Sequence, residues 1–289
     1  MIISVPQGQQ ETVSLPGGYE VNTYLFGGKK GKPVVLLHGG GVDSAMLSWR
    51  DTVPALVEAG FQVYLPDWPG YGSSPPPPKP FTQELLIEVT TGLLEAWGLK
   101  EASLAGISMG GGAALGFTLA HPERVEKLIL IGTYGLQDKT SAHFFSVLLV
   151  KLPLVNNLFY AMVRSSRWMI RETMKTIIRD PASLTEALID EAVVALRNPN
   201  AGKMFAQFQR DEARWTGVKT CYVPRLGEIK VPTLIVHGTA DIGVPVKYAR
   251  EAAGRIPNAK LHIIEGAGHW TQRDYPEEVN RVMVDFLRE

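Results

Sequence analysis

Short, continuous apolar runs alternate with longer segments of helical periodicity along most of this chain of 289 residues. The run at residues 34–38 ends at three consecutive glycines, and the run at 103–107 leads into another glycine-rich stretch. Continuous apolar runs of this length are typical of parallel strands that are covered by helices on both faces. The alternation therefore predicts a mixed α/β fold built on a mostly parallel sheet.

Six apolar runs and five helical patterns make up this alternation. The predicted strands are residues 34–38, 61–65, 103–107, 125–131, 233–237 and 261–264. The predicted helices are residues 51–59, 81–97, 109–120, 246–255 and 276–287. Near the start of the chain, residues 11–15 and 20–26 flank a Pro-Gly-Gly turn and predict an antiparallel hairpin. We therefore expect a sheet of eight strands with flanking helices.

The alternation stops between residues 134 and 227. The patterns in this part are helical, at residues 144–162, 168–178, 184–196 and 203–209, and prolines separate them. A segment of this length is too long to be a loop inside a compact domain. We therefore expect a helical cap at residues 134–227, inserted after the sixth strand between two core segments, residues 1–133 and 228–289.

Composition and charge exclude several classes of function. The 29 Lys and Arg residues balance the 29 Asp and Glu residues, so the chain lacks the basic field of a nucleic-acid-binding protein. The single cysteine, Cys221, excludes a disulfide framework and a cysteine zinc site. The first residues do not resemble a secretory signal, and Lys151 and Pro153 interrupt the most apolar stretch. We expect a cytoplasmic protein with a small-molecule substrate and no membrane partner.

The strongest motif is Gly106-Ile107-Ser108-Met109-Gly110, which lies between a predicted strand and a predicted helix. Glycines two residues to each side of a serine remove the Cβ atoms that would collide at a sharp strand-to-helix turn. Such a turn lifts the hydroxyl above the edge of the sheet, beside a helix N-terminus that favours developing negative charge. Ser108 is therefore the candidate nucleophile.

A serine nucleophile needs a base, and His269 is the best of six histidines. It lies in the glycine-rich segment 266–270, after the last predicted strand, where a loop gives a base the exposure it needs. The other five fit structural positions or lie away from this edge: His38, His121, His143, His237 and His262. Of these, we interpret His38 as part of a turn and His237 as a core residue.

The base in turn needs an orienting acid, for which Asp241 is the candidate. It follows the predicted strand 233–237 and precedes His269 by 28 residues. A carboxylate there can accept a hydrogen bond from Nδ1–H of the imidazole and leave Nε2 facing the serine. The alternative for Asp241 is a helix cap near Pro245, and Asp67 and Asp211 are weaker candidates for the acid.

The oxyanion that forms after attack needs two hydrogen-bond donors. The N–H of Met109 is one candidate, and the N–H of Gly40, in the loop after the strand at residues 34–38, is the other. Gly41 and Trp270 are candidates for substrate contact, although the Trp270 ring fits a packing role equally well. Aromatic residues of the expected cap are candidates for a lid: Phe144, Phe145, Phe159, Tyr160, Trp168 and Trp215.

These motifs together resemble those of the α/β-hydrolase superfamily. The segments that carry the resemblance are residues 38–41, 67–73, 106–110, 239–241 and 268–270, and the order Ser, Asp, His is that of the family. The resemblance implies Ser108 as nucleophile, Asp241 as acid and His269 as base, with no cofactor and no metal. Serine at the turn departs from dehalogenases and epoxide hydrolases, which place aspartate there. The subgroup that it resembles has a helical cap.

The resemblance implies a serine hydrolase that cleaves ester-like carbonyl substrates through a covalent acyl-enzyme. The subgroup also includes carbon–carbon hydrolases of meta-cleavage products, which act on vinylogous diketones and would use the same groups. In that case one of Arg164, Arg167 and Arg171 would hold the substrate carboxylate. A ligand receptor without turnover is the alternative of another class, and the intact triad disfavours it.

Overall fold

The computed structural model describes residues 7–140, 143–152, 158, 161–198 and 200–289. Its main sheet has eight strands in the order β1-β2-β4-β3-β5-β6-β9-β10. Their bounds are β1 Gln9–Leu15, β2 Tyr19–Phe26, β3 Pro33–Leu37, β4 Gln62–Pro66, β5 Ala102–Ile107, β6 Val125–Ile131, β9 Thr233–Gly238 and β10 Ala259–Ile264. In this sheet β2 runs antiparallel to both of its neighbours, and the pairs from β4 to β10 are parallel. The predicted hairpin and the mostly parallel sheet are confirmed.

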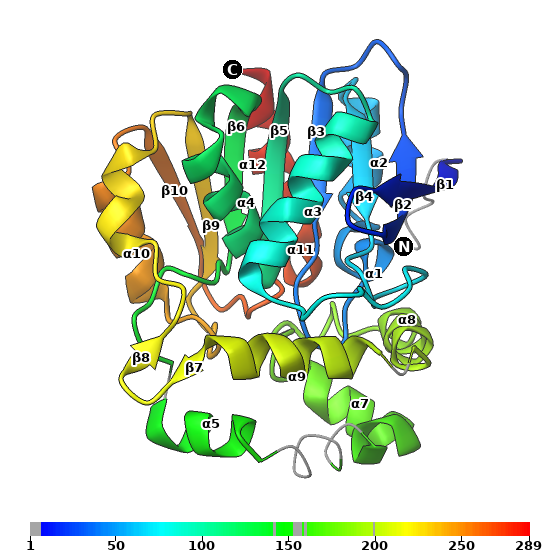
Figure 1. Ribbon diagram of the computed structural model, residues 1–289, viewed down its shortest axis with the longest axis vertical. Helices are drawn as coiled ribbons and strands as arrows, with labels where there is room; N and C mark the ends of the chain where they lie inside the picture. Colours follow the sequence, from blue (N-terminus) through cyan, green and yellow to red (C-terminus); the bar gives the residue numbers. More distant parts are fainter. Residues whose placement is uncertain (1–6, 141–142, 153–157, 159–160, 199) are drawn as a thin grey trace.

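Helices cover both faces of the sheet, as the apolar runs predict (Figure 1). One face carries α3 Gln83–Ala96, α4 Met109–Ala120 and α10 Val246–Arg255. The other carries α1 Ala45–Trp49, α2 Val53–Glu58, α11 Thr271–Asp274 and α12 Pro276–Arg288. Two 3₁₀ turns lie at Pro122–Arg124, before β6, and at Val223–Glu228, where the chain returns from the expected cap toward β9. Each face has its own apolar cluster, and every residue of β5 and β9 is buried between the two.

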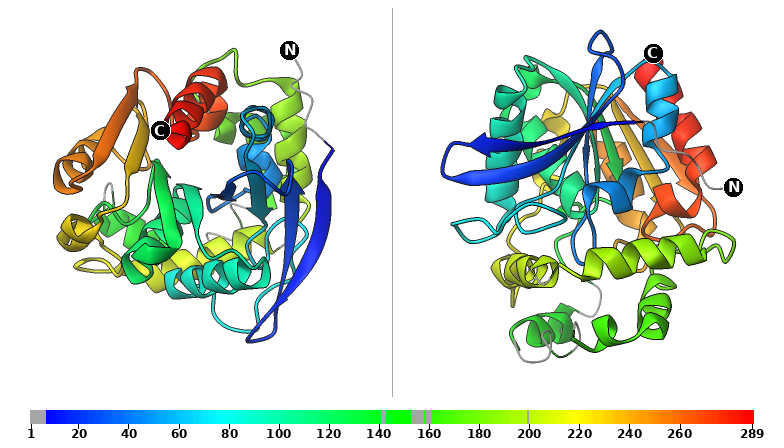
Figure 2. Two further views of the ribbon diagram at one scale, coloured as in Figure 1. Left: turned by 90° about the horizontal axis from the view of Figure 1, so that it is seen from above. Right: turned by 90° about the vertical axis from the view of Figure 1, so that its right-hand side faces the viewer.

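The segment between β6 and β9 forms a separate layer across the carboxyl ends of the parallel strands (Figures 1 and 2). Its described elements are α5 His143–Val150, α7 Arg167–Met174, α8 Glu186–Leu196, α9 Ala201–Glu212, β7 Ala213–Arg214 and β8 Gly217–Val218. The two-residue strands β7 and β8 pair as a small hairpin, too short for a sequence pattern to predict. Of the helix expected at 144–162, α5 ends at Val150, and residues 153–157, 159 and 160 lie outside the described residues.

This layer, with the loop that leads into it from β6, lies where the cap is expected, although the exact domain boundaries stay a prediction. Among the described helices, none has both the length and the apolar character needed to cross a membrane.

Candidate active site

Ser108 lies at the turn between β5 and α4 with φ 50° and ψ −119°, the only positive φ at a described residue other than glycine. The two flanking glycines make this turn possible, because a Cβ on Gly106 would lie 2.4 Å from the carbonyl oxygen of Gly110. Backbone hydrogen bonds hold the serine, whose N–H donates to Ile131 and whose carbonyl accepts from Gly112. The local sequence therefore forces the side chain away from the sheet.

Asp241 and His269 lie in the loops that follow β9 and β10. His269 Nδ1 lies 2.8 Å from Asp241 Oδ2, and Asp241 Oδ1 accepts the N–H groups of Gly243 and Val244 at 2.8 and 2.9 Å. Burial alone raises the pKa of Asp241, but hydrogen bonds from His269 and Val244 and the imidazole charge outweigh burial and lower the pKa. An ionised carboxylate only accepts, so Nδ1 of His269 carries the proton and Nε2 stays free to act as a base.

A second histidine lies against the same carboxylate. His237 is fully buried, with Nε2 2.7 Å from the Val244 carbonyl oxygen and 3.4 Å from Asp241 Oδ2. Burial is the largest effect on its pKa and lowers it, which favours a neutral ring that donates Nε2–H to the carbonyl. The interpretation of His237 as a core residue is confirmed, and its contact with Asp241 is an addition that the sequence pattern does not indicate.

The loop after β3 brings its glycines beside Ser108. A Cβ on Gly39 would lie 3.5 Å from Ser108 Cβ, and the Gly39 N–H already donates to Asp43 Oδ2 at 2.8 Å. A Cβ on Gly40 would lie 3.4 Å from the Met109 sulfur, so these two residues are neighbours in space. Met109 is the first residue of α4, where an N–H has no intrahelical acceptor. The two residues whose N–H groups are expected to bind an oxyanion are therefore neighbours, and their role as donors stays a prediction.

His38 belongs to this loop as a structural residue. It is fully buried, its Nδ1 lies 2.8 Å from the Gly39 carbonyl oxygen, and its Nε2 accepts the Trp68 N–H at 3.0 Å. Burial lowers the pKa of His38 to about 3, so the ring is neutral at ordinary pH. The expectation that His38 supports a turn is confirmed.

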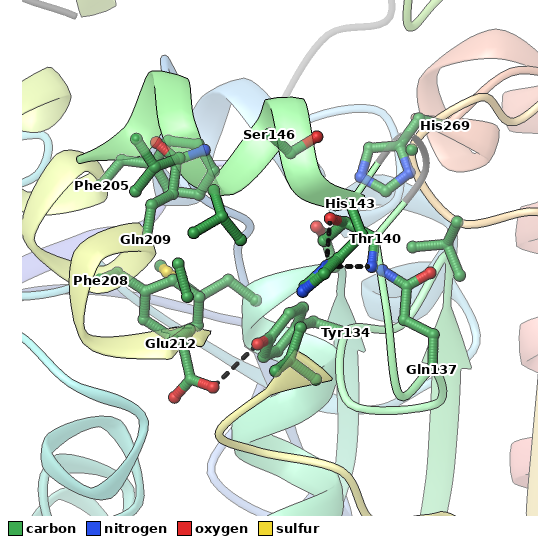
Figure 3. A pocket seen from close by; sticks show the side chains of 18 residues that line it. Tyr134, Gln137, Thr140, His143, Ser146, Phe205, Phe208, Gln209, Glu212 and His269 are labelled. Atoms are coloured by element: carbon green, nitrogen blue, oxygen red, sulfur yellow. Dashed lines mark hydrogen bonds between the residues drawn. The ribbon is translucent and has the colours of Figure 1, made fainter. Parts of the chain in front are cut away.

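Ser108 and His269 open into one cavity of about 310 Å³ between the sheet edge and the cap (Figure 3). The residues that line it are Ser108, Met109, Tyr134, Gln137, Thr140, His143, Ser146, Val147, Val150, Phe205, Phe208, Gln209, Glu212, Ala213, Val218, Gly243, Val244 and His269. None of these described residues is Lys or Arg. Most of the exposed wall is apolar, and its polar side chains besides Ser108, Tyr134 and His269 are those of Gln137, Thr140, His143, Ser146, Gln209 and Glu212.

Several expected contacts do not lie at this cavity. Gly40, Gly41 and Trp270 are not among its lining residues, and the Trp270 ring, 4% exposed, packs in the apolar cluster of one sheet face. Their substrate contacts therefore stay predictions without support from this geometry. Arg167 pairs with Glu186 and Asp190, and Arg171 pairs with Glu186, on the outer surface of α7 and α8.

The expected lid aromatics are also placed differently. Phe144, Phe145, Trp168 and Trp215 are each more than half exposed and do not line the cavity, and Phe159 and Tyr160 lie outside the described residues. The aromatic wall comes instead from Phe205 and Phe208 of α9 and from Tyr134. Helix α5 turns Ser146, Val147 and Val150 toward the cavity, which leaves its phenylalanines on the outer side. Periodicity alone does not tell which face of a cap helix meets the core.

Comparison with known proteins agrees with this architecture. The model of a protein family described as alpha/beta hydrolase fold matches residues 32–276. A 2-hydroxy-6-oxo-6-phenylhexa-2,4-dienoate hydrolase of Comamonas testosteroni is 34% identical over 265 residues, covering 90% of this chain and 89% of the relative. A 2-hydroxy-6-oxononadienedioate/2-hydroxy-6-oxononatrienedioate hydrolase of Comamonas testosteroni is 30% identical and covers 96% of this chain and 94% of the relative.

Among solved structures, the meta-cleavage product hydrolase from Pseudomonas fluorescens IP01 superposes with a TM-score of 0.79 at 25% identity. The similarity covers 98% of this chain and 98% of that one. The fold class predicted from the sequence is thereby confirmed.

Proposed function

Because the chain belongs to the α/β-hydrolase fold family, we propose that it is a serine hydrolase that cleaves neutral ester-like carbonyl substrates. One observation carries the choice of a neutral substrate. Ser108 and His269 open into a largely apolar cavity that has no Lys or Arg among its described lining residues. Such a cavity binds an uncharged acyl or alcohol group by removing apolar surface from water.

In the proposed reaction, Ser108 Oγ attacks the ester carbonyl carbon while His269 Nε2 takes the hydroxyl proton. Asp241 stabilises the imidazolium, and the N–H groups of Gly40 and Met109 donate to the tetrahedral oxyanion. The intermediate collapses as the imidazolium gives its proton to the leaving alcohol, which leaves an acyl group on Ser108. His269 then deprotonates a water molecule that attacks this acyl group, and release of the acid restores the serine hydroxyl.

The second candidate is a carbon–carbon hydrolase that acts on a vinylogous diketone. The names of the relatives at 34% and 30% identity favour it, because both are hydrolases of dienoate or dienedioate compounds. Such substrates carry a carboxylate, which needs a cation or several hydrogen-bond donors when it is buried. Arg167 and Arg171 already pair with cap carboxylates, and none of the three candidate arginines, Arg164, Arg167 and Arg171, lines the cavity. The absence of a lysine or arginine from the described lining of the cavity is the reason to prefer the neutral ester.

Replacing the nucleophile tests whether the chain catalyses hydrolysis at all. We expect Ser108→Ala to lower kcat/KM on p-nitrophenyl esters by at least about 10³-fold, as for other triad members. A fluorophosphonate probe should label the wild type at Ser108 and leave the variant unlabelled. Near-normal turnover by the variant would disprove the nucleophile, whereas absence of turnover by the wild type on any ester or dienoate would favour a receptor.

A paired substrate assay separates the two hydrolase candidates. We expect the wild type to turn over p-nitrophenyl hexanoate faster than 2-hydroxy-6-oxo-6-phenylhexa-2,4-dienoate, the compound in the name of one relative. Arg167→Ala and Arg171→Ala should change neither rate more than about twofold, because neither arginine lines the cavity. Exposed ion pairs also contribute little to stability, so both variants should fold. Faster turnover of the dienoate, with a selective loss in an arginine variant, would establish the carbon–carbon hydrolase instead.

A further inference from the structure

Glu212, the last residue of α9, is a buried carboxylate in the wall of the cavity and has no cationic partner among the described residues. It is 3% exposed. Its three hydrogen-bond donors are neutral: the Tyr134 hydroxyl, the Thr220 N–H and the Thr220 hydroxyl, each at 2.8 Å. Burial is the largest effect on the pKa of Tyr134 and raises it, as the neighbouring Glu212 also does, so the tyrosine remains a neutral donor. The negative charge of Glu212 is therefore not neutralised by a neighbouring cation.

Gln137 adds a second acceptor to the same cavity. Its side chain is 3% exposed and lines the cavity, and its Oε1 atom has no hydrogen-bond partner among the described residues. Buried amide oxygens are nearly always paired, because an unpaired one costs free energy. A ligand with a hydrogen-bond donor would satisfy this atom.

The short segment of residues 134–137 connects both acceptors to the nucleophile, because it contains Gln137 and the tyrosine that donates to Glu212. The Tyr134 N–H donates to the Ser108 carbonyl at 3.0 Å, and the hydroxyl of the same tyrosine reaches Glu212. One tyrosine residue therefore links the backbone of the nucleophile to the carboxylate. Figure 3 shows the contact between the Tyr134 hydroxyl and Glu212. A substrate whose ester group reaches Ser108 and whose chain extends along Tyr134 would place its far end near this carboxylate, because all three residues line the same cavity.

We propose that Glu212 and Gln137 determine specificity by selecting substrates whose far end is a neutral hydrogen-bond donor or a cation and by rejecting those that end in a carboxylate. The proposal rests on the proposed ester hydrolysis, and it extends the substrate class from neutral esters to esters that carry a cation at the far end. Its physical basis is that two like charges in a water-poor cavity repel far more strongly than in water. The acceptor atoms conversely gain a partner from a hydroxyl or ammonium group.

A matched series of substrates tests the proposal. The p-nitrophenyl esters of hexanoic acid and of its omega-hydroxy, omega-ammonium and omega-carboxylate analogues differ only at the far end. A second series, the acetates of the corresponding alcohols, covers the opposite orientation of the ester. In at least one series we expect the wild type to hydrolyse the carboxylate member with a kcat/KM at least about tenfold below that of the unsubstituted ester.

Glu212→Gln should raise the ratio of kcat/KM for the carboxylate member to kcat/KM for the unsubstituted ester at least about tenfold. The same ratio for the ammonium member should fall. Glu172→Gln is the matched control, because it removes the same charge from an exposed position on α7 outside the cavity, and its ratios should equal those of the wild type. Gln137→Leu removes an oxygen that makes no hydrogen bond to any described residue, so folding should be preserved, and the preference for the hydroxyl member should fall.

The outcomes distinguish this proposal from the function on which it rests. If the unsubstituted ester is hydrolysed in a Ser108-dependent way but the wild type shows no discrimination in either series, this proposal alone is overturned. Unchanged ratios in Gln137→Leu and in folded Glu212→Gln overturn it as well. If Glu212→Gln does not fold, the kcat/KM ratio of the hydroxyl member to the unsubstituted ester in Gln137→Leu decides. A ratio equal to that of the wild type then overturns the proposal. If no ester of either series is hydrolysed, the proposed function fails and this proposal fails with it.

Discussion

Ser108 holds a backbone conformation that residues with a side chain rarely adopt, with φ 50°. Conformations of this kind cost about 1–3 kcal/mol and persist where the surrounding structure enforces them. Here the hydrogen bonds to Ile131, Gly112 and Tyr134 supply that support. The strained residue is Ser108, which is the proposed nucleophile. Its backbone conformation directs the hydroxyl away from the sheet.

His38 and Asp43 are two buried residues whose effects on pH-dependent stability oppose each other. Burial lowers the pKa of His38 to about 3, and burial, the largest effect on Asp43, raises its pKa to about 7. In the unfolded chain these values are about 6.5 and 3.9. Between about pH 4 and 6.5, folding therefore releases a proton from His38 and binds one at Asp43, so the two contributions to the pH dependence cancel.

In the Asp43→Asn variant, only His38 of these two residues still contributes to the pH dependence of the free energy of unfolding. Because the folded pKa of His38 is below its unfolded pKa, its stabilising effect is lost as the pH falls from about 6.5 toward 3. We expect the free energy of unfolding of Asp43→Asn to fall by about 1.4 kcal/mol per pH unit more steeply than that of the wild type. Urea denaturation at several pH values measures this slope, with exposed Asp285→Asn as control. Equal slopes in variant and wild type would contradict the assignment.

At the scale of elements, the packing of α4 on the sheet depends on the absence of a side chain at Gly110. A Cβ there would lie 2.4 Å from the carbonyl oxygens of Leu37 and His38, which are backbone atoms of β3 and its following loop. Gly254 in α10 differs, because a Cβ there meets no atom within 4 Å and its φ is not positive. The two glycines therefore form a matched pair for substitution.

We expect Gly110→Ala to lower the free energy of unfolding by about 1–3 kcal/mol or more, because α4 must shift away from β3. Gly254→Ala should raise it by about 0.4–1 kcal/mol, because alanine loses less conformational entropy on folding. Thermal and urea denaturation of the two variants measure both effects. A stable Gly110→Ala variant with full esterase activity would contradict the close helix–strand contact.

At the scale of the whole molecule, Asp274 joins the cap to the loop of the proposed base. Its carboxylate is 1% exposed and accepts the N–H groups of Arg179 and Asp180 from the cap and of Gly268 from the core. Gly268 directly precedes His269. Together with the Trp270 N–H, which donates to the carbonyl of the cap residue Ile177 at 3.1 Å, this side chain fixes the position of the cap relative to the residue proposed as base.

We expect Asp274→Asn to lower both stability and kcat, because an amide nitrogen then faces a backbone N–H. The loss of one charge-assisted hydrogen bond costs about 1.5–3 kcal/mol. Asp180→Asn is the control, because that side chain accepts only the Ala182 N–H in the described structure. Urea denaturation and steady-state kinetics on a neutral ester give the two readouts. A variant with wild-type stability and kcat would show that the cap and the His269 loop are positioned independently.

The sequence alone predicts most of the sheet, because the apolar patterns that identify its strands are local. A continuous apolar run such as residues 34–38 identifies a strand buried on both faces, and observed boundaries differ from prediction by one or two residues, as at β4 and β10. The loops that carry Ser108, Asp241 and His269 follow β5, β9 and β10. Because parallel strands end at the same edge of a sheet, residues far apart in the chain meet there.

The tertiary structure alone decides which residues of the cap reach the cavity. Phe144 and Phe205 have the same chemical character, yet Phe144 is exposed and Phe205 lines the cavity. Glu212 follows Arg210 and Asp211 in a charged stretch that resembles a solvated surface, yet it is buried against Tyr134. The sequence determines the reactive groups because strand and turn patterns position them locally. Long-range packing of the cap against the sheet edge determines the walls, and no short sequence pattern encodes that contact.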